Sequence, residues 1–292
     1  MRPEPVGSLN ILIEELSSQP QVLTLYPRAL INSLLPRKRQ SLPRDGLRLA
    51  GIRPQAEHLE RYRRVCGFQD PRHLPVTYPH MLAFPLHMAL MTQHDFPYPL
   101  LGLVHIANRI EQYRPLPTQQ GIDIECYFGE EQEHEKGRVF SIVTQAHIDG
   151  EKFWESQSSM LHRCKSSLAA SERKAPLPPP TSSATWSLDE GLGRRYARVS
   201  GDYNPIHLHA LSARLFGFDR AIAHGMWSKA RCLAALADEL APAYSVDVQF
   251  KLPILLPASV DFSHHRQGLG LEFALHDHAT GKPHLSAQVH FQ

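Results

Sequence analysis

The sequence predicts an α+β fold in which two similar units each wrap an antiparallel sheet around one long helix. Three features predict it: a repeated segment at domain-sized spacing, a proline-rich stretch between the copies, and helical stripes followed by alternating strand patterns. The chain has 292 residues, 42% hydrophobic and 21% charged, so it can bury a core as one large domain or two ordinary ones.

The repeat is the strongest of these features. Residues 62–71 read Tyr-Arg-Arg-Val-Cys-Gly-Phe-Gln-Asp-Pro, and residues 196–205 read Tyr-Ala-Arg-Val-Ser-Gly-Asp-Tyr-Asn-Pro. At the same offset, His73 matches His207. A period of this length indicates an internal duplication and not a short solenoid repeat.

The duplication divides the chain into four parts. Residues 1–55 are expected to form an N-terminal extension of undefined role, in which Leu9–Leu16 fits a short amphipathic helix. Residues 56–165 form the first copy and residues 187–292 the second. Residues 166–186 are rich in proline and serine and include three consecutive prolines, which favour an extended linker.

Two helices are expected in the second copy. Ser187 and Glu190 match a capping box, which predicts a helix that Gly201 ends. A longer helix begins at about His224, and its apolar stripe indicates a core position. The apolar positions of the two helices are Leu188, Leu192, Tyr196 and Val199, then Met226, Ala230, Leu233, Ala237 and Leu240.

Alternating apolar residues predict strands in both copies. In the first copy they are Ile106 and Ile110, then Ile122, Ile124 and Cys126, then Phe140, Ile142, Thr144, Ala146 and Ile148. In the second they are Val246, Val248, Phe250 and Leu252, then Leu271, Phe273 and Leu275, then Leu285, Ala287, Val289 and Phe291. A sheet with one apolar face needs a cover, and the long helix is the available one.

Reactive side chains gather just after the first of these two helices. Asp202, Asn204 and His207 fall within six residues of a turn that Pro205 stiffens. A carboxylate and an imidazole can together hold and deprotonate a water molecule. Gly225 starts the long helix, where free backbone N–H groups suit a developing oxyanion. Taken singly, Asp202 and Asn204 also fit ordinary turn-capping residues and His207 a structural histidine.

With its downstream His224-Gly225, the segment from Tyr196 to His207 resembles the signature of the MaoC-like acyl dehydratases, the hydratase-2 type of the hotdog superfamily. The segment Phe250-Lys251-Leu252-Pro253 resembles the strand after that family's central helix, and the first copy resembles the degenerate first hotdog of its double-hotdog members. The resemblance therefore implies a double hotdog whose catalytic unit is the second copy.

The resemblance also implies roles. Asp202 and His207 would activate water for addition to C3 of a trans-2-enoyl thioester, with Asn204 ordering the water or the carboxylate. The N–H of Gly225 would polarise the thioester carbonyl. The product would be a (3R)-3-hydroxyacyl thioester, or the reaction would run backwards as a dehydration, on an acyl-CoA or an acyl-carrier-protein thioester. No metal and no redox cofactor is needed.

The first copy lacks this machinery. At the repeat offset, Asp202 corresponds to Phe68 and Asn204 to Asp70, so His73 is expected to lack its acidic partner. The counterpart of Gly225 is expected to be Pro85, which has no N–H to donate. One active site per chain follows from these differences.

Other classes of function remain or are disfavoured. A thioester hydrolase and a non-catalytic acyl-thioester binding protein are the alternatives, because hotdog scaffolds host several activities. A net charge of +2 disfavours nucleic-acid binding, no apolar run is long enough for a membrane span, and paired histidines such as His276 and His278 fix no third metal ligand. Four widely spaced cysteines favour the cytoplasm, and both a monomer and a homodimer satisfy the sheets.

Overall fold

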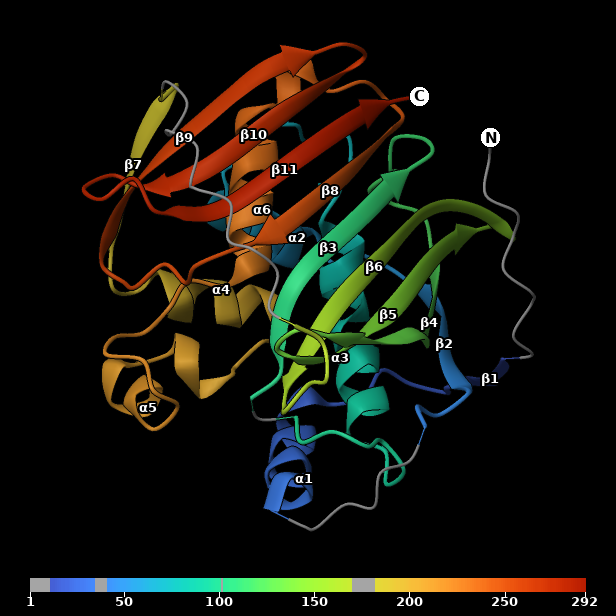
Figure 1. The fold of residues 1–292 in the computed structure, drawn as a ribbon. Helices are drawn as coiled ribbons and strands as arrows, with labels where there is room; N and C mark the ends of the chain where they lie inside the picture. Colours follow the sequence, from blue (N-terminus) through green and yellow to red (C-terminus); the bar gives the residue numbers. More distant parts are fainter. Residues whose placement is uncertain (1–10, 35–40, 101, 170–181) are drawn as a thin grey trace.

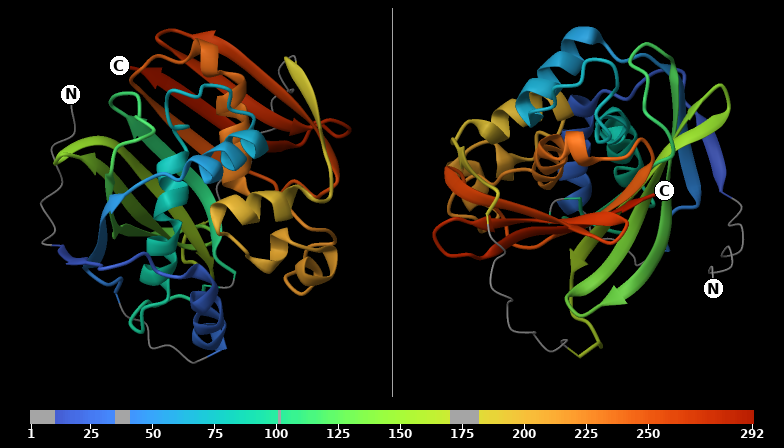
Figure 2. Two further views of the ribbon diagram at one scale, coloured as in Figure 1. Left: turned by 180° about the vertical axis from the view of Figure 1, so that it is seen from behind. Right: turned by 90° about the horizontal axis from the view of Figure 1, so that it is seen from above.

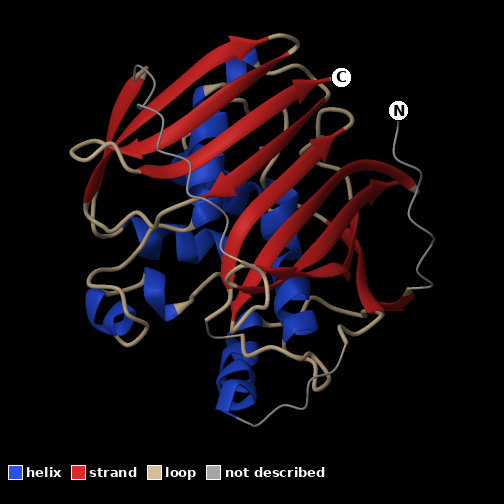
Figure 3. Cartoon of the chain, in the orientation of Figure 1, coloured by secondary structure: helices blue, strands red, loops and turns tan. Residues whose placement is uncertain are grey.

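The computed structural model describes residues 11–34, 41–100, 102–169 and 182–292. In this part of the chain, eleven strands form one continuous curved sheet (Figure 1). Seen from behind, the helices lie against one face of this sheet (Figure 2). The α+β class expected from the sequence is confirmed, with the strands and helices distributed along the whole chain (Figure 3).

The first half of the chain contains three helices and six strands among its described residues. The helices are α1 (Val22–Leu34), α2 (Ala56–Cys66) and α3 (Tyr78–Met91). The strands are β1 (Leu12–Glu15), β2 (Asp45–Ile52), β3 (Val104–Gln112), β4 (Ile122–His134), β5 (Gly137–Ile148) and β6 (Glu151–Arg163).

The second half repeats the plan with shorter helices. Its helices are α4 (Leu192–Ser200), α5 (Ala210–Arg214) and α6 (Gly225–Ala235), with 3-10 turns at Pro205–His207 and Ala237–Glu239. Its strands are β7 (Ala184–Leu188), β8 (Tyr244–Phe250), β9 (Ala258–Gln267), β10 (Gly270–Asp277) and β11 (Pro283–Phe291).

The two halves are joined through their sheets. The strand order is β1-β2-β4-β5-β6-β3-β8-β11-β10-β9-β7, and β3 pairs antiparallel with β8, placing Ile110 opposite Val246. The antiparallel sheet expected for each half is present, and the two sheets join edge to edge into one; the parallel pair β1–β2 is the exception among the described strands. Joining the halves satisfies backbone N–H and C=O groups that two separate edges would expose.

The core lies between the sheet and the two long helices, α3 and α6. Almost every residue of α3 is buried, and so are Met226, Ala230 and Leu233 of α6. The rest of the expected stripe was wrong, because α6 ends at Ala235 and Ala237 is exposed in the 3-10 turn that follows. The alternating strand residues also point into the core, with Ile124 and Val246 fully buried. The period-2 pattern thus identified the inward face of most of the expected strands. Leu252 was assigned to a strand wrongly, because β8 ends at Phe250 and Leu252 is exposed.

Two helix predictions were wrong at the edges of the sheet. Ser187 does not cap a helix: it lies in β7 opposite Ser259 of β9, and α4 begins at Leu192 without a side-chain cap. The segment Leu9–Leu16 is not helical where it is described, because Leu12–Glu15 forms β1. Both strands pair along an edge of the sheet, a long-range interaction that overrides the local helical pattern.

The segment before residue 56 is also part of the fold. In β2, Leu47 and Leu49 are buried and lie opposite Cys126 and Ile124 of β4. This segment was expected to lie outside the repeat, yet it extends the first half's sheet. Of the expected linker, residues 170–181 lie outside the described residues, and β7 already begins at Ala184.

The duplication is visible in the backbone. Tyr62 and Tyr196 are both buried, with ring centroids 6.2 Å apart. Gly67 ends α2 and Gly201 ends α4, each with a left-handed φ (+89° and +76°) that favours glycine. The proposed match between Pro85 and Gly225 was wrong, because Pro85 lies inside α3 whereas Gly225 begins α6.

The cysteines and the lengths of the helices bear on two further expectations. All four cysteines lie in the described part of the chain and are free, three of them buried and Cys164 exposed. None of the described helices is both long and apolar enough to cross a membrane.

Candidate active site

The reactive side chains are held by a tight turn after α4. Gly201 ends the helix by donating its N–H to the carbonyl of Ala197 at 2.9 Å. The Ser200 hydroxyl then accepts the N–H of Asp202 at 3.1 Å. These two local bonds turn the chain so that Asp202 leaves the helix axis and the 3-10 turn can follow.

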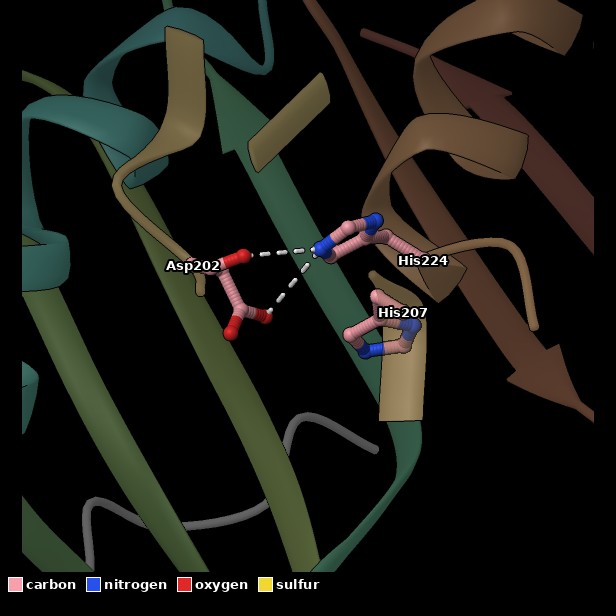
Figure 4. Close-up of side chains that lie close together, drawn as sticks. All are labelled: Asp202, His207 and His224. Atoms are coloured by element: carbon pink, nitrogen blue, oxygen red, sulfur yellow. Dashed lines mark hydrogen bonds and ion pairs between the residues drawn. The ribbon is translucent and has the colours of Figure 1, made fainter. Parts of the chain in front are cut away.

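Three side chains meet at this turn. One carboxylate oxygen of Asp202 and one ring nitrogen each of His207 and His224 lie within 4.8 Å of one another. Figure 4 shows the carboxylate directed towards the two imidazoles. One water that makes two hydrogen bonds of about 2.8 Å leaves its partners roughly 4.5 Å apart, so this spacing suits a bridging water.

The tautomer of His207 follows from its partner. Nδ1 lies 2.8 Å from the carbonyl oxygen of Ile222, which can only accept, so Nδ1 carries the proton. Nε2 of the neutral ring is then unprotonated and available as a base. Burial lowers the pKa of His207 below its usual value, an effect that the Asp202 charge opposes, so the ring is neutral at neutral pH.

His224 supports the turn from the other side. Its Nε2 donates to the backbone carbonyl of Asp202 at 3.0 Å and lies 3.8 Å from the carboxylate. Its ring stacks on that of His207 with centroids 3.7 Å apart. Burial, followed by the neighbouring His207, lowers the pKa of His224 to about 3. A neutral His224 therefore fixes both the turn and the plane of His207.

Asn204 and Gly225 occupy supporting positions. The side-chain oxygen of Asn204 accepts the N–H of Ile206 and so caps the 3-10 turn, while its backbone N–H donates to Asp202 Oδ1 at 3.1 Å. Gly225 is the first residue of α6, so its N–H has no acceptor within the helix. Asn204 thus acts on Asp202 through the backbone, and its amide serves the turn.

The matching turn of the first copy is different. His73 does have an acidic neighbour: its Nδ1 lies 2.8 Å from Asp70 Oδ2, contrary to the expectation that it stands alone. Both side chains are about 40% exposed, and Arg72 also contacts Asp70. Phe68, at the Asp202 position, packs against the core. The first copy therefore has an exposed surface pair where the second has a buried cluster.

The cluster has to be considered as a metal site. Asp202, His207 and His224 form the only group of three potential ligands found among the described residues, and one carboxylate with two imidazoles suits zinc. However, the two rings are stacked face to face, and His224 Nε2 is committed to the Asp202 carbonyl. Ligands normally approach a metal from different directions, so this arrangement fits a hydrogen-bonded cluster better than a chelate.

One member of the cluster, His224, and one neighbour, Tyr26, were missing from the residues that the sequence assigned a role. His224 was recognised as part of the downstream motif but given no role, although its adjacency to Gly225 was a usable signal. Tyr26 of α1 places its hydroxyl 3.4 Å from Asp202 Oδ1. That contact joins positions 176 apart and follows no pattern in the sequence.

The chain is similar to known proteins over most of its length. Residues 172–288 match the family described as MaoC like domain. The chain is 33% identical over 279 residues to 3-hydroxyacyl-thioester dehydratase X of Mycobacterium tuberculosis, covering 93% of this chain and 99% of that protein.

Solved structures give the same result. A crystal structure of HtdX of Mycobacterium tuberculosis matches with a TM-score of 0.76 at 31% identity, covering 85% of this chain and 100% of that one. A MaoC-like dehydratase from Phytophthora capsici matches with a TM-score of 0.71 at 18% identity, covering 85% and 95%, and so shares the fold. The double-hotdog fold is thereby confirmed, and the chain belongs to the family of MaoC-like dehydratases.

Proposed function

We propose that this protein is a hydro-lyase that adds water to trans-2-enoyl thioesters to give (3R)-3-hydroxyacyl thioesters, or runs the same reaction as a dehydration. The observation that carries the proposal is the convergence of the Asp202 carboxylate and a neutral His207 whose Nε2 is unprotonated. The similarity to a 3-hydroxyacyl-thioester dehydratase over 93% of the chain supports the same reaction class.

In the proposed mechanism, a water molecule lies between Asp202 and His207. Its oxygen bonds to C3 of the substrate while one of its protons passes to the Asp202–His207 pair. The electrons of the double bond move towards the thioester carbonyl, whose oxygen gains negative charge opposite the N–H of Gly225. The pair then returns the proton to C2, so that one water is consumed and no other group is needed.

Asn204 and His224 hold Asp202 in the position that this mechanism requires. The N–H of Asn204 and the imidazole of His224 orient Asp202 through its carboxylate and its backbone carbonyl. The second half from β7 onward is proposed as the catalytic hotdog, and the first half together with β2 as the degenerate one. The four free cysteines support a cytoplasmic location, and a homodimer stays a prediction.

The test is loss of absorbance at the enoyl-thioester band, measured on crotonyl-CoA and longer enoyl-CoAs, with chiral analysis of the product. Asp202→Asn and His207→Ala should each remove most turnover while the protein stays folded at the assay temperature, which circular dichroism checks. The variant Asp70→Asn is the matched control, because it alters the equivalent turn of the first copy. Near-normal kcat in either of the first two variants would contradict the assigned roles.

The same reactions also separate the two alternative functions. A thioester hydrolase releases free CoA thiol, which a thiol-reactive dye detects, whereas hydration leaves the thioester intact. A non-catalytic binding protein would change neither signal. The hotdog scaffold alone cannot decide among these three outcomes, since it hosts several activities.

A further inference from the structure

One hydroxyl group of helix α1 contacts the catalytic turn. Tyr26 lies on α1, outside both copies of the repeat. Its hydroxyl oxygen accepts the N–H of Tyr203 at 2.6 Å. The same oxygen lies 3.4 Å from Asp202 Oδ1 and 3.5 Å from the carbonyl oxygen of Gly201. One phenol therefore contacts three consecutive residues of the turn that holds the Asp202 carboxylate.

The hydrogen-bond pattern defines which way the phenol acts. Because Tyr203 N–H donates to the oxygen, the single phenolic proton is left to donate to the Asp202 carboxylate or to the Gly201 carbonyl. Burial, and then the charge of Asp202, raise the pKa of Tyr26 well above its usual value. The phenol therefore keeps its proton at all working pH values and acts as a donor and not as a base.

We propose that Tyr26 is a positioning residue for the hydration reaction, by which the N-terminal segment holds the Asp202 turn in its reactive geometry. The inference rests on the proposed function, since it concerns the same carboxylate. Tyr203 N–H and Asp202 Oδ1 are held by one oxygen atom, so moving the backbone of the turn away from α1 breaks the 2.6 Å bond, and rotating the carboxylate breaks its 3.4 Å contact with the phenol. A displacement of about 1 Å is enough to slow catalysis substantially.

The rest of α1 is anchored independently of this hydroxyl. Asn32, near the other end of the helix, donates its side-chain N–H to the carbonyl of Thr92 at the end of α3 at 3.0 Å. Val22 packs beside Gly201. Removing the phenolic oxygen should therefore leave α1 in place, and Asn32 supplies a variant that weakens the attachment of the helix without touching the turn.

The experiment compares Tyr26→Phe with Asn32→Ala in the full chain. Tyr26→Phe should lower kcat for an enoyl-CoA about tenfold, the loss expected for one hydrogen bond to a charged group, with KM changed less than twofold. Asn32→Ala should keep kcat within twofold of the unsubstituted protein, even if its thermal midpoint falls as far as that of Tyr26→Phe. Equal loss of kcat in both variants, or none in Tyr26→Phe, would overturn the proposal.

A second measurement does not depend on activity. Hydrogen–deuterium exchange should become faster at the Tyr203 amide in Tyr26→Phe and remain unchanged there in Asn32→Ala. Unchanged exchange at the Tyr203 amide in Tyr26→Phe would refute the positioning role of Tyr26, whether or not the proposed reaction is correct. If the unsubstituted protein hydrates no enoyl-CoA, the proposed function is wrong. If Tyr26→Phe still speeds exchange at the Tyr203 amide in that case, Tyr26 holds the turn independently of that function.

Discussion

Replacing Gly225 by proline gives the most specific test of the oxyanion donor. Proline removes the backbone N–H but is favoured at the first position of a helix, where that N–H has no intrahelical acceptor. The preceding residue, His224, already has φ −69° and ψ 136°, which is the extended conformation that a following proline requires. We therefore expect α6 to begin at the same place in Gly225→Pro.

The effect of losing the Gly225 N–H can be separated from the steric effect of adding a side chain at position 225. A Cβ atom at position 225 would meet the ring of Phe250 at 3.1 Å, so any side chain there displaces that ring slightly. Gly225→Ala introduces the same Cβ and keeps the N–H. Loss of one oxyanion donor costs on the order of 10²–10³-fold in kcat, equivalent to about 2.7–4 kcal/mol. The proline variant should therefore be slower than the alanine variant by that factor.

The assay measures kcat on an enoyl-CoA at saturating concentration, with circular dichroism and the thermal midpoint as checks that both variants fold. The comparison is made between the two variants and not with the unsubstituted protein, because both carry the contact with Phe250. If proline and alanine variants have kcat values within about threefold of each other, the N–H of Gly225 is not the group that stabilises the oxyanion.

Three further outcomes are expected. His224→Phe should keep a ring stacked on His207 but lose the N–H donated to the Asp202 carbonyl. We expect kcat to fall about tenfold with little change in KM. An unchanged kcat would contradict the role of His224 in holding Asp202. Stability should fall as pH drops from about 6.5 to 4, because burial lowers the pKa of His87, His105 and His224 to about 3, 4 and 3, so the unfolded chain binds more protons. Each of these histidines lowers the free energy of unfolding by about 1.4 kcal/mol per pH unit between its folded and unfolded pKa. A thermal midpoint independent of pH over this range would contradict the expected loss of stability. Dialysis against a chelator should leave kcat unchanged, and a loss restored by Zn²⁺ would show that the cluster holds a metal.

Much of the fold could be predicted because its signals are local. Gly201 was predicted to end a helix and does so, and its counterpart in the repeat, Gly67, ends α2 in the same left-handed conformation that glycine favours. Strand patterns such as Leu271-Phe273-Leu275 identified buried faces correctly. These features depend on neighbouring residues, and the sequence presents neighbours directly.

The errors came from interactions that act over long distances along the chain. Ser187 satisfies a local capping pattern, yet the edge of β9 needs a partner strand and Ser187 supplies part of it. β9 itself was not predicted, although Val260 and Phe262 alternate as buried residues. The contact between Tyr26 and Asp202 could not be predicted, because it depends on where α1 packs and not on any local spacing.

The first copy, which we propose to be inactive, also helps to position the proposed catalytic groups. The helix α6 carries Gly225 at its start and is hydrogen-bonded to the first half through two side chains. Trp227 donates its ring N–H to the carbonyl of Val65 at 3.0 Å. Lys229, fully buried, donates to the side-chain and backbone oxygens of Asn108 in β3 at 2.6 and 3.0 Å.

A buried ammonium is costly unless it is hydrogen-bonded, and burial accordingly lowers the pKa of Lys229. The third acceptor, the carbonyl of Val246, lies in β8 at 3.4 Å, so the lysine ties α6 to the strands on both sides of the junction between the halves. The first half thus fixes the helix whose N-terminus faces the proposed oxyanion, while α1 contacts the turn that carries Asp202. Although every proposed catalytic group belongs to the second copy, the geometry of the site also depends on the first copy and on α1 of the N-terminal segment.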